Sequence, residues 1–217
     1  MIQAEVAKKV VSKIPLKTYD TVLDLGCGNG ALYRCFKEAS IEVKKFIVLD
    51  ASQEMLALHP TALCVEKIQS DFNKENFLSS HIGSKLDMIV SASAIQWSQN
   101  LDATLSELSV ISDVLHAAIF TSNTFKTIQK VANTKSPIYD AKTLKKVFLE
   151  HYAHAEFEVH TYTLEFDSRK EMFNYIKKSG VSGGEKRLSY TEVKKLIKTY
   201  PLDYLEFEVL FVEANNS

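Results

Sequence analysis

The stretch Val22-Leu23-Asp24-Leu25-Gly26-Cys27-Gly28-Asn29-Gly30 decides the fold, because it reads as a buried strand that runs directly into a glycine turn. Glycines spaced two residues apart permit a tight turn and let a ligand approach the bare backbone, since no Cβ stands in the way. Residues 31–39 then have a helical pattern. A strand, a glycine turn and a helix in this order predict a nucleotide-type binding site at the first turn of an α/β sheet.

Two further strand ends strengthen this prediction. The apolar run 45–50 ends on Asp50, twenty residues after Gly30, where a carboxylate can accept hydrogen bonds from both hydroxyls of a ribose. Ser70-Asp71-Phe72 follow the next predicted strand and would place an acid and an aromatic ring beside an adenine. Because the carboxyl ends of parallel strands meet at one edge of a sheet, we expect these groups to gather there.

The glycine spacing separates two kinds of nucleotide ligand. A dinucleotide turn has the pattern G-x-G-x-x-G and supports a pyrophosphate at a helix N-terminus. Here the pattern is G-x-G-x-G, and the preceding Asp24 would repel a phosphate. A cationic ligand suits this carboxylate, and the sulfonium and α-amino group of S-adenosylmethionine are both positive. We therefore expect Asp24 to orient that amine, directly or through water, while a nicotinamide dinucleotide is the disfavoured alternative.

Composition limits the class of protein. The chain has 217 residues, 46% of them hydrophobic, which is enough to bury the core of a single domain. Lys and Arg number 26 against 27 Asp and Glu, so no strong overall field attracts nucleic acid or an anionic membrane. The chain shows no CxxC pair, signal-peptide pattern or apolar run of the ~20 residues that span a membrane. We expect a cytoplasmic protein without a nucleic-acid or membrane partner.

Strands alternate with helices through the first part of the chain. The predicted strands are 21–25, 45–50, 63–68, 86–91 and 117–121, and the predicted helices are 2–14, 31–39, 52–58 and 101–115. Strands that are apolar on both faces favour a mostly parallel sheet with helices on both sides. In the last third, predicted helices 141–151, 169–179 and 191–199 interleave with alternating stretches 156–166 and 205–212, which predict an antiparallel closing hairpin.

The motifs resemble those of class I S-adenosylmethionine-dependent methyltransferases. The resemblance is carried by Asp24-Leu25-Gly26-Cys27-Gly28-Asn29-Gly30, by Asp50-Ala51-Ser52-Gln53-Glu54-Met55-Leu56 and by Leu86-Asp87-Met88-Ile89-Val90. It implies an α/β, three-layer Rossmann-like fold with a seven-stranded, mostly parallel sheet whose last strand is antiparallel. It also implies one domain over residues 1–217, with a cofactor-binding half of about 1–123 and substrate-side helices and the hairpin in 124–217.

Carried over residue by residue, the resemblance implies a set of cofactor contacts. The glycines would line the methionine moiety, Asp50 the ribose, Met55 and Phe72 the adenine faces, and Asp71 the adenine amine. The end of the fourth strand, residues 91–97, would form the floor of the reaction site. The expected cofactor contacts are Asp24, Gly26, Gly28, Gly30, Asp50, Ala51, Met55, Asp71, Phe72 and Ser91. Trp97 would lie at the reaction site, although a core aromatic explains it equally well.

A finer resemblance is to malonyl-acyl-carrier-protein O-methyltransferases of biotin synthesis. It rests on Ala94-Ile95-Gln96-Trp97-Ser98, on Phe120-Thr121-Ser122-Asn123-Thr124-Phe125 and on Phe173-Asn174-Tyr175-Ile176-Lys177-Lys178-Ser179-Gly180-Val181. It implies methylation of the free carboxylate of a malonyl thioester on an acyl carrier protein. That family usually has a further N-terminal segment that folds over the cofactor, so we expect a shortened or absent lid here.

The acceptor chemistry requires little of the protein. A carboxylate is ionised at pH 7, because its reference pKa lies about three units lower, so we expect no general base. A cationic clamp is expected from Lys177, where the resemblance has its lysine, with Lys178, Lys126 and Arg169 as alternatives. Lys186 and Arg187 are expected to steer an acidic carrier.

Other readings stay open beside this one. Another carboxylate or natural-product methyltransferase and a non-catalytic S-adenosylmethionine-binding protein both agree with the motifs. His151, His154 and His160 have no Cys or acid at ligand spacing, so we expect no metal site. Cys27 receives no catalytic role, because its small size accounts for its place in the glycine turn.

Overall fold

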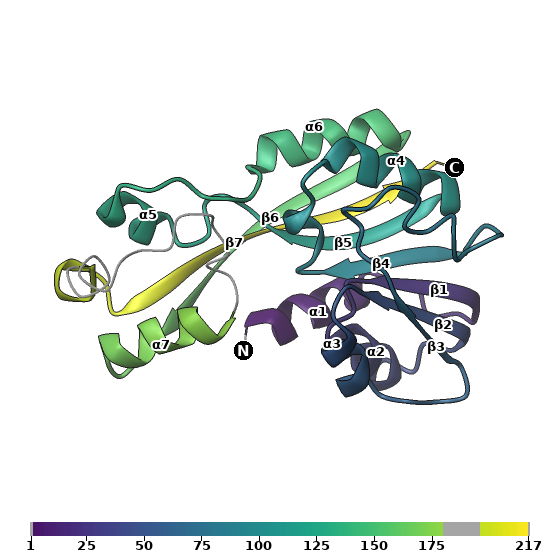
Figure 1. Cartoon of the computed structure of the whole chain (residues 1–217), viewed down its shortest axis with the longest axis horizontal. Helices are drawn as coiled ribbons and strands as arrows, with labels where there is room; N and C mark the ends of the chain where they lie inside the picture. Colours follow the sequence, from purple (N-terminus) through teal and green to yellow (C-terminus); the bar gives the residue numbers. More distant parts are fainter. Residues whose placement is uncertain (1, 180–195, 217) are drawn as a thin grey trace.

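The computed structural model describes residues 2–179 and 196–216 of the chain (Figure 1). The elements are α1 (Ile2–Ser12), β1 (Tyr19–Leu25), α2 (Ala31–Glu38), β2 (Val43–Asp50), α3 (Gln53–Leu58), β3 (Val65–Gln69), β4 (Met88–Ala92), the 3₁₀ helix η1 (Ile95–Trp97), α4 (Leu101–Ile111), β5 (Val114–Phe120), α5 (Lys126–Ala132), α6 (Ala141–His151), β6 (His154–Glu165), α7 (Arg169–Ser179) and β7 (Tyr204–Asn215). Residues 196–199 are also helical.

The strands form one seven-stranded sheet in the order β3-β2-β1-β4-β5-β7-β6. Strands β1 to β5 pair in parallel, and β7 lies antiparallel between β5 and β6. This arrangement confirms the predicted fold class, including the antiparallel last strand and its hairpin. The chain runs outward from β1 to β3 and then returns to place β4 beside β1. In open α/β sheets, ligands bind outside the carboxyl ends of the strands at such a reversal.

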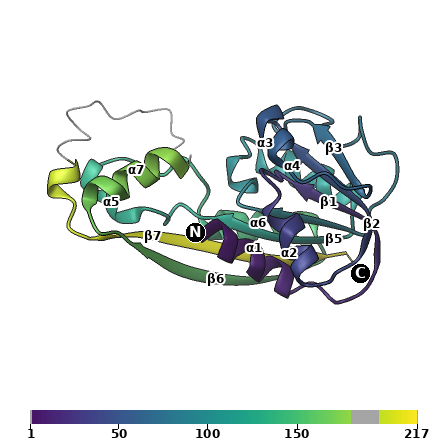
Figure 2. The same cartoon turned by 90° about the horizontal axis from the view of Figure 1, so that it is seen from below.

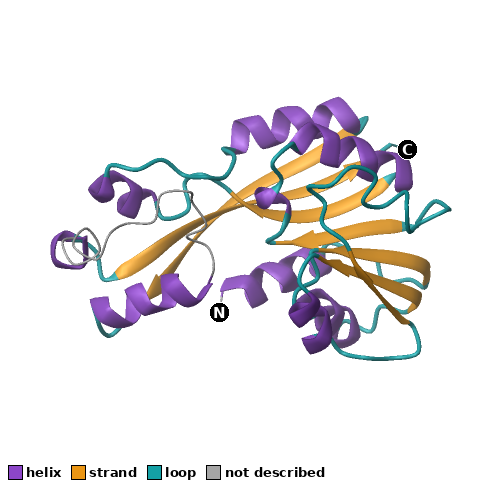
Figure 3. Ribbon diagram, in the orientation of Figure 1, coloured by secondary structure: helices purple, strands orange, loops and turns teal. Residues whose placement is uncertain are grey.

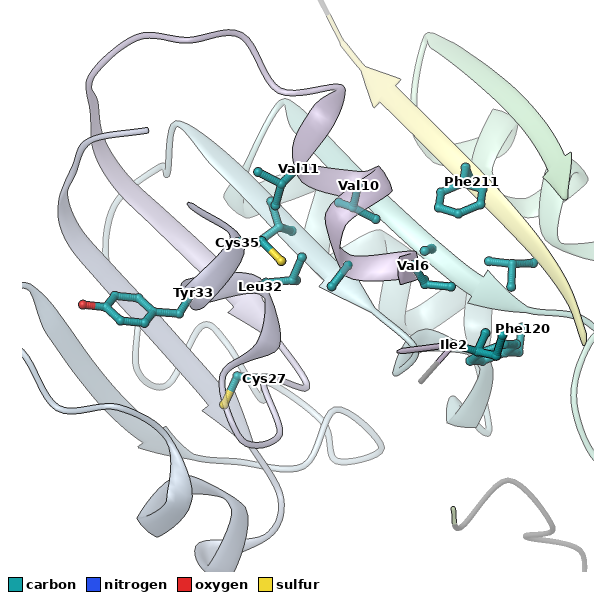
Figure 4. Close-up of a cluster of buried hydrophobic side chains, with 14 of the residues drawn as sticks. Ile2, Val6, Val10, Val11, Cys27, Leu32, Tyr33, Cys35, Phe120 and Phe211 are labelled. Carbon is teal, nitrogen blue, oxygen red and sulfur yellow. The ribbon is translucent and has the colours of Figure 1, made fainter. Parts of the chain in front are cut away.

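Helices cover both faces of this sheet (Figure 3). Helices α1, α2 and α3 cover one face, where their apolar side chains share a core with Val22 and Phe46. Figure 4 shows apolar side chains of α1 between those of α2 and those of β5 and β7. Helices α4 and α6 cover the other face, where their apolar side chains share a core with Leu23 and Leu25. Each fully buried side chain of this kind stabilises the fold by roughly 1.5–3 kcal/mol.

The alternation along β1 positions a carboxylate inside the protein. Val22 belongs to the core beneath α1 and α2, whereas Leu23 and Leu25 belong to the core beneath α4 and α6. Because successive side chains of a strand point to opposite faces, Asp24 lies on the same side as Val22, under the first two helices. Asp20 is exposed near the start of β1, whereas Asp24 is the buried acid of the strand and lies beside the turn that follows it.

The β6–β7 hairpin extends well past the rest of the sheet (Figure 2). Both strands have 12 residues, while the pairing of β7 with β5 stops at Phe120 and Val209. Helices α5 and α7 lie along the extension. The molecule thus has a second lobe, formed by α5, α7 and the hairpin tip, that follows the carboxyl end of β5.

Several predicted bounds differ from the structure. The helix predicted at 101–115 ends at Ile111, because Leu115 already belongs to β5. Helix α5 and η1 were not predicted, and the helix predicted at 191–199 lies mostly outside the described residues. Among the residues that the structure describes, no helix is long and apolar enough to cross a membrane.

Candidate functional site

The turn after β1 is tied to the neighbouring strand by its own backbone. The N–H groups of Gly26 and Cys27 both donate to the carbonyl of Leu49 in β2, at 2.8 and 3.0 Å. Gly26, Gly28 and Gly30 all have positive φ, at 70°, 51° and 88°, a region that favours glycine. A Cβ on Gly28 would meet nothing within 4 Å, so the turn presents bare backbone to open space.

Asp50 is held at the mouth of this turn. Its Oδ2 accepts from the N–H of Gly28 at 2.9 Å, and its Oδ1 accepts from the N–H of Ser52 at 2.8 Å. Ser52 in turn caps α3, because its Oγ accepts from the N–H of Met55 at 3.3 Å. Each oxygen of Asp50 keeps a second lone pair. The carboxylate is therefore oriented by the backbone and can still accept hydrogen bonds from a ligand.

Asp24 is the buried acid of the site. It is 1% exposed, and neither of its carboxylate oxygens has a hydrogen-bond partner among the described residues. Burial, followed by the nearby negative charge of Asp50, raises the pKa of Asp24 to about 8. Since a buried acid without a partner costs free energy, the site favours a ligand that brings a positive charge or a donor to Asp24. The ammonium of S-adenosylmethionine fits this requirement.

The segment after β4 adds polar atoms without partners. The Nε2 of Gln96 donates to the carbonyl of Ser93 at 2.8 Å, which leaves the Oε1 of Gln96 as a free acceptor. This Oε1 and the Oγ of Ser93 are buried and have no partner among the described residues. Ser93 also has a positive φ of 64°, a strained conformation that is common at functional sites. A ligand with N–H or O–H donors would satisfy these atoms.

Ser93 and Gln96 were not singled out in the sequence, although they lie in the segment 91–97 predicted as the floor of the site. The signal was present, because polar side chains interrupt an otherwise apolar run there. Their lack of partners, however, depends on packing that the sequence does not display.

The expected adenine side gathers at the ends of β2 and β3. Asp71 and Phe72 are half-buried, and the Oδ1 of Asp71 accepts from the N–H of Asn73 at 2.9 Å. The side chain of Met55 is 37% exposed on α3, and Ala51 is exposed between β2 and α3. These residues share the carboxyl edge of the sheet with the glycine turn. Their contacts with a cofactor stay predictions.

Two further predicted residues have structural contacts. Ser91 is fully buried, and its Oγ donates to the carbonyl of Leu25 at 2.9 Å, which fastens the end of β4 to the end of β1. Trp97 is half-buried in η1, and its carbonyl accepts from the Nδ2 of Asn73 at 3.4 Å. Both residues lie at the predicted floor of the reaction site. Their catalytic and cofactor-binding roles stay predictions.

Four of the predicted basic residues, Lys126, Arg169, Lys177 and Lys178, lie on the second lobe. The Nζ of Lys126 is 3.9 Å from the Oε1 of Glu206. The guanidinium of Arg169 donates to the carbonyls of residues 197 and 198, at 3.4 and 3.0 Å. Lys177 and Lys178 lie in α7, while Lys186 and Arg187 lie outside the described residues.

Two carboxylates of β7 that sequence reasoning missed hold the segment after β5. The Oε1 of Glu208 accepts from Thr121 Oγ1 at 2.6 Å and from Asn123 Nδ2 at 3.0 Å. The Oε1 of Glu206 accepts from Thr127 Oγ1 at 2.9 Å. These charge-assisted hydrogen bonds fix the path from β5 into α5. The described residues contain no group of three or more His, Cys, Asp or Glu that could hold a metal ion.

The comparisons with known proteins agree with this geometry. Residues 22–114 match a family described as a methyltransferase domain. A malonyl-[acyl-carrier protein] O-methyltransferase of Haemophilus influenzae is 26% identical over 186 residues, covering 78% of this chain and 64% of that protein. The protein of the same name from Enterobacter lignolyticus is 28% identical over 108 residues, covering 49% and 40%. The chain thus spans less than two thirds of the length of either relative.

A solved structure extends the likeness to the whole chain. The crystal structure of a candidate methyltransferase from Bacillus halodurans matches with a TM-score of 0.65 and 17% identity, covering 98% of this chain and 99% of that one. At 17% identity the match supports the fold alone. The strand order and this likeness together confirm the class I methyltransferase fold that the resemblance of the sequence motifs implied.

Proposed function

We propose that this chain, which has a methyltransferase domain with the class I fold, methylates the free carboxylate of a malonyl thioester carried by an acyl carrier protein. Enzymes of this class use S-adenosylmethionine as the methyl donor, in agreement with the cofactor expected from the glycine turn. The acceptor follows from the names of the two curated relatives. The product would be the malonyl thioester with its free carboxylate converted to a methyl ester, made early in biotin synthesis.

The observation that carries the proposal is that both carboxylate oxygens of buried Asp24 lack a partner within the described part of the chain, next to a turn with open space at Gly28. A dinucleotide would bring phosphates toward this carboxylate, whereas S-adenosylmethionine brings an ammonium. Asp24 and the turn would hold the methionine moiety, and the oriented carboxylate of Asp50 would hold the ribose. These residues therefore fit the cofactor of the family.

When bound, the cofactor supplies an electrophilic methyl group on a positively charged sulfur. The acceptor carboxylate is already ionised at pH 7, so the chain needs no base to activate it. The contribution of the protein is alignment of the acceptor and exclusion of water. Ser91 supports this alignment by fixing β4 to β1, and half-buried Trp97 supplies an apolar surface beside the strand end.

We propose Lys177 as the residue that orients the acceptor carboxylate. Lys177 stands where the finer resemblance has its lysine, whereas Arg169 is engaged with backbone carbonyls and Lys126 lies near Glu206. Lys177 lies in α7, on the lobe that follows the expected reaction site. Its ammonium would form a charge-assisted hydrogen bond with the carboxylate. The variant Lys177→Ala should raise the acceptor KM by roughly tenfold or more, with Lys177→Arg less affected.

The deciding experiment measures release of S-adenosylhomocysteine from the protein with S-adenosylmethionine. Malonyl-acyl carrier protein is compared with malonyl-coenzyme A, acetyl-acyl carrier protein and free malonate. We expect turnover with malonyl thioesters, fastest on the carrier, and none with the acetyl carrier, which has no free carboxylate. Absence of turnover with every malonyl thioester would reject the proposed acceptor. Calorimetry would then separate a methyltransferase for another acceptor or a non-catalytic binder from a chain that does not bind the cofactor.

A further inference from the structure

Six of the ten lysines in the cofactor-binding half, residues 1–123, pair with neighbouring acids. Lys8 pairs with Glu38, Lys44 with Asp20, Lys45 with Glu66 and Lys85 with Asp113, with N···O distances of 2.7–3.6 Å. Lys9 and Lys13 share Glu158. Each of these exposed pairs contributes little to stability, but together they offset the charge of more than half of the lysines in this part of the chain.

Helix α5 and the residues after it differ in this respect. Residues 122–139 contain Lys126, Lys130 and Lys135 and not one Asp or Glu. All of these lysines are exposed, and neither Lys130 nor Lys135 forms an ion pair with any of the described residues. Lys126 and Lys130 stand four residues apart and therefore share one face of the helix. We call Lys126, Lys130 and Lys135 the α5 basic face.

The acids that border α5 are engaged in internal contacts. Glu206 accepts from the N–H and the Oγ1 of Thr127, and Glu208 accepts from Thr121 and Asn123. Asp140 caps α6 by accepting from the N–H of Thr143 at 2.8 Å. Apart from the 3.9 Å contact between Glu206 and Lys126, these carboxylates position the chain, so they leave the charges of Lys130 and Lys135 available to an external partner.

Few residues along the chain separate the α5 basic face from the proposed reaction site. Strand β5 ends at Phe120, at the same edge of the sheet as the glycine turn, and α5 begins at Lys126. A link of this length spans at most ~20 Å. Figures 1 and 2 both show α5 beyond the end of β5, on the lobe with α7. Helix α5 has no buried residue, so its charged face belongs to the surface of the protein.

We propose that the α5 basic face is the docking surface for the acidic carrier protein that delivers the acceptor. This inference rests on the proposed function and adds where the partner binds. Exposed lysines such as Lys130 and Lys135, which have no ion pair within the described structure, are suited to steering a partner of opposite charge, which raises the association rate more than it tightens the final complex. An extended nucleic acid fits less well, because the formal net charge of the chain is −1.

The test reverses charge at Lys130 and Lys135, which have no ion pair to lose within the described structure. The variant K130E/K135E is compared with K142E/K146E, which reverses two exposed lysines four residues apart on α6 and changes the net charge equally. This control loses one exposed ion pair, Lys146–Glu150, which contributes little to stability. Each protein is assayed with malonyl-acyl carrier protein and with a malonyl thioester of a small neutral thiol. Binding of fluorescently labelled malonyl-acyl carrier protein is measured separately by anisotropy, over a range of salt concentrations.

We expect K130E/K135E to raise the KM for the carrier by about tenfold and to flatten its salt dependence. Turnover of the small thioester and all properties of K142E/K146E should be unchanged. An equal rise of the KM for the carrier in both variants, or no rise in K130E/K135E, overturns the proposal that the α5 basic face is the docking surface. If the wild type binds the carrier without methylating it, the proposed function fails while the anisotropy comparison still decides the docking surface. If the wild type does not bind the carrier, the proposed docking surface is rejected.

Discussion

Gly26 and Ala94 lie so close that a Cβ atom on Gly26 would come within 2.2 Å of the Cβ of Ala94. Gly26 begins the turn after β1, and Ala94 lies after β4, between Ser93 and Gln96 in the sequence. The Oγ of Ser93 and the Oε1 of Gln96 have no hydrogen-bond partner among the described residues. The proposed cofactor turn therefore packs directly on the proposed floor of the reaction site. A shift of one would displace the other, so cofactor binding and acceptor alignment share one rigid contact.

The first prediction compares two glycines of this turn. Gly26→Ala should destabilise the protein by about 2–4 kcal/mol, because the new Cβ overlaps that of Ala94 and the residue has φ of 70°. Gly28→Ala should cost only about 1–2 kcal/mol, since its Cβ meets nothing within 4 Å and the penalty is the positive φ alone. Urea unfolding measures both changes.

The same two variants separate stability from binding. The Cβ of Gly28→Ala would occupy the open space assigned to the cofactor, so its affinity for S-adenosylmethionine should fall more than its stability. A Gly28→Ala protein with wild-type cofactor affinity would show that the ligand does not approach the turn there.

The second prediction concerns Asp24 and pH. In the free protein burial raises the pKa of Asp24 from about 3.8 to about 8. The folded state therefore binds more protons than the unfolded state between these values, and stability falls as pH rises from about 4 to 8. Asp24→Asn removes this titration, so its stability relative to wild type should increase with pH. Thermal unfolding of both proteins at several pH values measures the difference.

Cofactor binding supplies an independent readout for Asp24. An ammonium ligand favours the ionised carboxylate, so binding below pH 8 should release a proton. Calorimetry in buffers of different ionisation enthalpy detects that release. Asp24→Asn should abolish it and weaken binding by about 10–100-fold, the contribution of one charge-assisted hydrogen bond. Equal proton release by both proteins would assign the titration to another group.

Much of this site is visible in the sequence, because its strongest constraints are local. The glycine pattern, the acid in β1 and the acid that ends β2 each follow from short-range rules, and the predicted α6 and α7 match their observed bounds. Helix α5 was missed because it buries no residue and follows Phe125, which has a positive φ, so no apolar period marks it. The hydrogen bonds between β7 and the segment after β5 join residues more than 75 positions apart, which no local pattern encodes.

The third prediction tests whether Glu208 positions the segment after β5, which lies on the acceptor side of the site. Glu208→Ala should destabilise the protein by about 1.5–3 kcal/mol, because Thr121 and Asn123 both lose a charged acceptor. It should also raise the acceptor KM while leaving cofactor affinity unchanged, since the released segment follows β5 and not the glycine turn. Glu208→Gln keeps an oxygen acceptor for Thr121, so its stability and its acceptor KM should lie between those of the wild type and those of Glu208→Ala. An equal loss of cofactor affinity would show that Glu208 supports the whole site.

The last prediction concerns the ion pairs that fasten α1 to the hairpin. Glu158 of β6 binds Lys13, Lys9 and His160 by side-chain hydrogen bonds, with Lys9 at 3.0 Å and His160 at 3.0 Å, and these lower its pKa to about 2. Because the folded pKa lies below the ordinary value near 4.5, the stabilisation is complete above that pH and disappears as pH falls toward 2.

Glu158→Gln should therefore lower the Tm slightly at pH 7 and have no further effect near pH 2. High salt should reduce the Tm difference between Glu158→Gln and the wild type at pH 7, because these groups are partly exposed to solvent. Glu156→Gln changes an exposed acid two residues earlier on the same strand and serves as the control. If both variants unfold alike at pH 7, the ion pairs do not hold α1, and the apolar contacts of Val6 and Val10 with the core carry that helix alone.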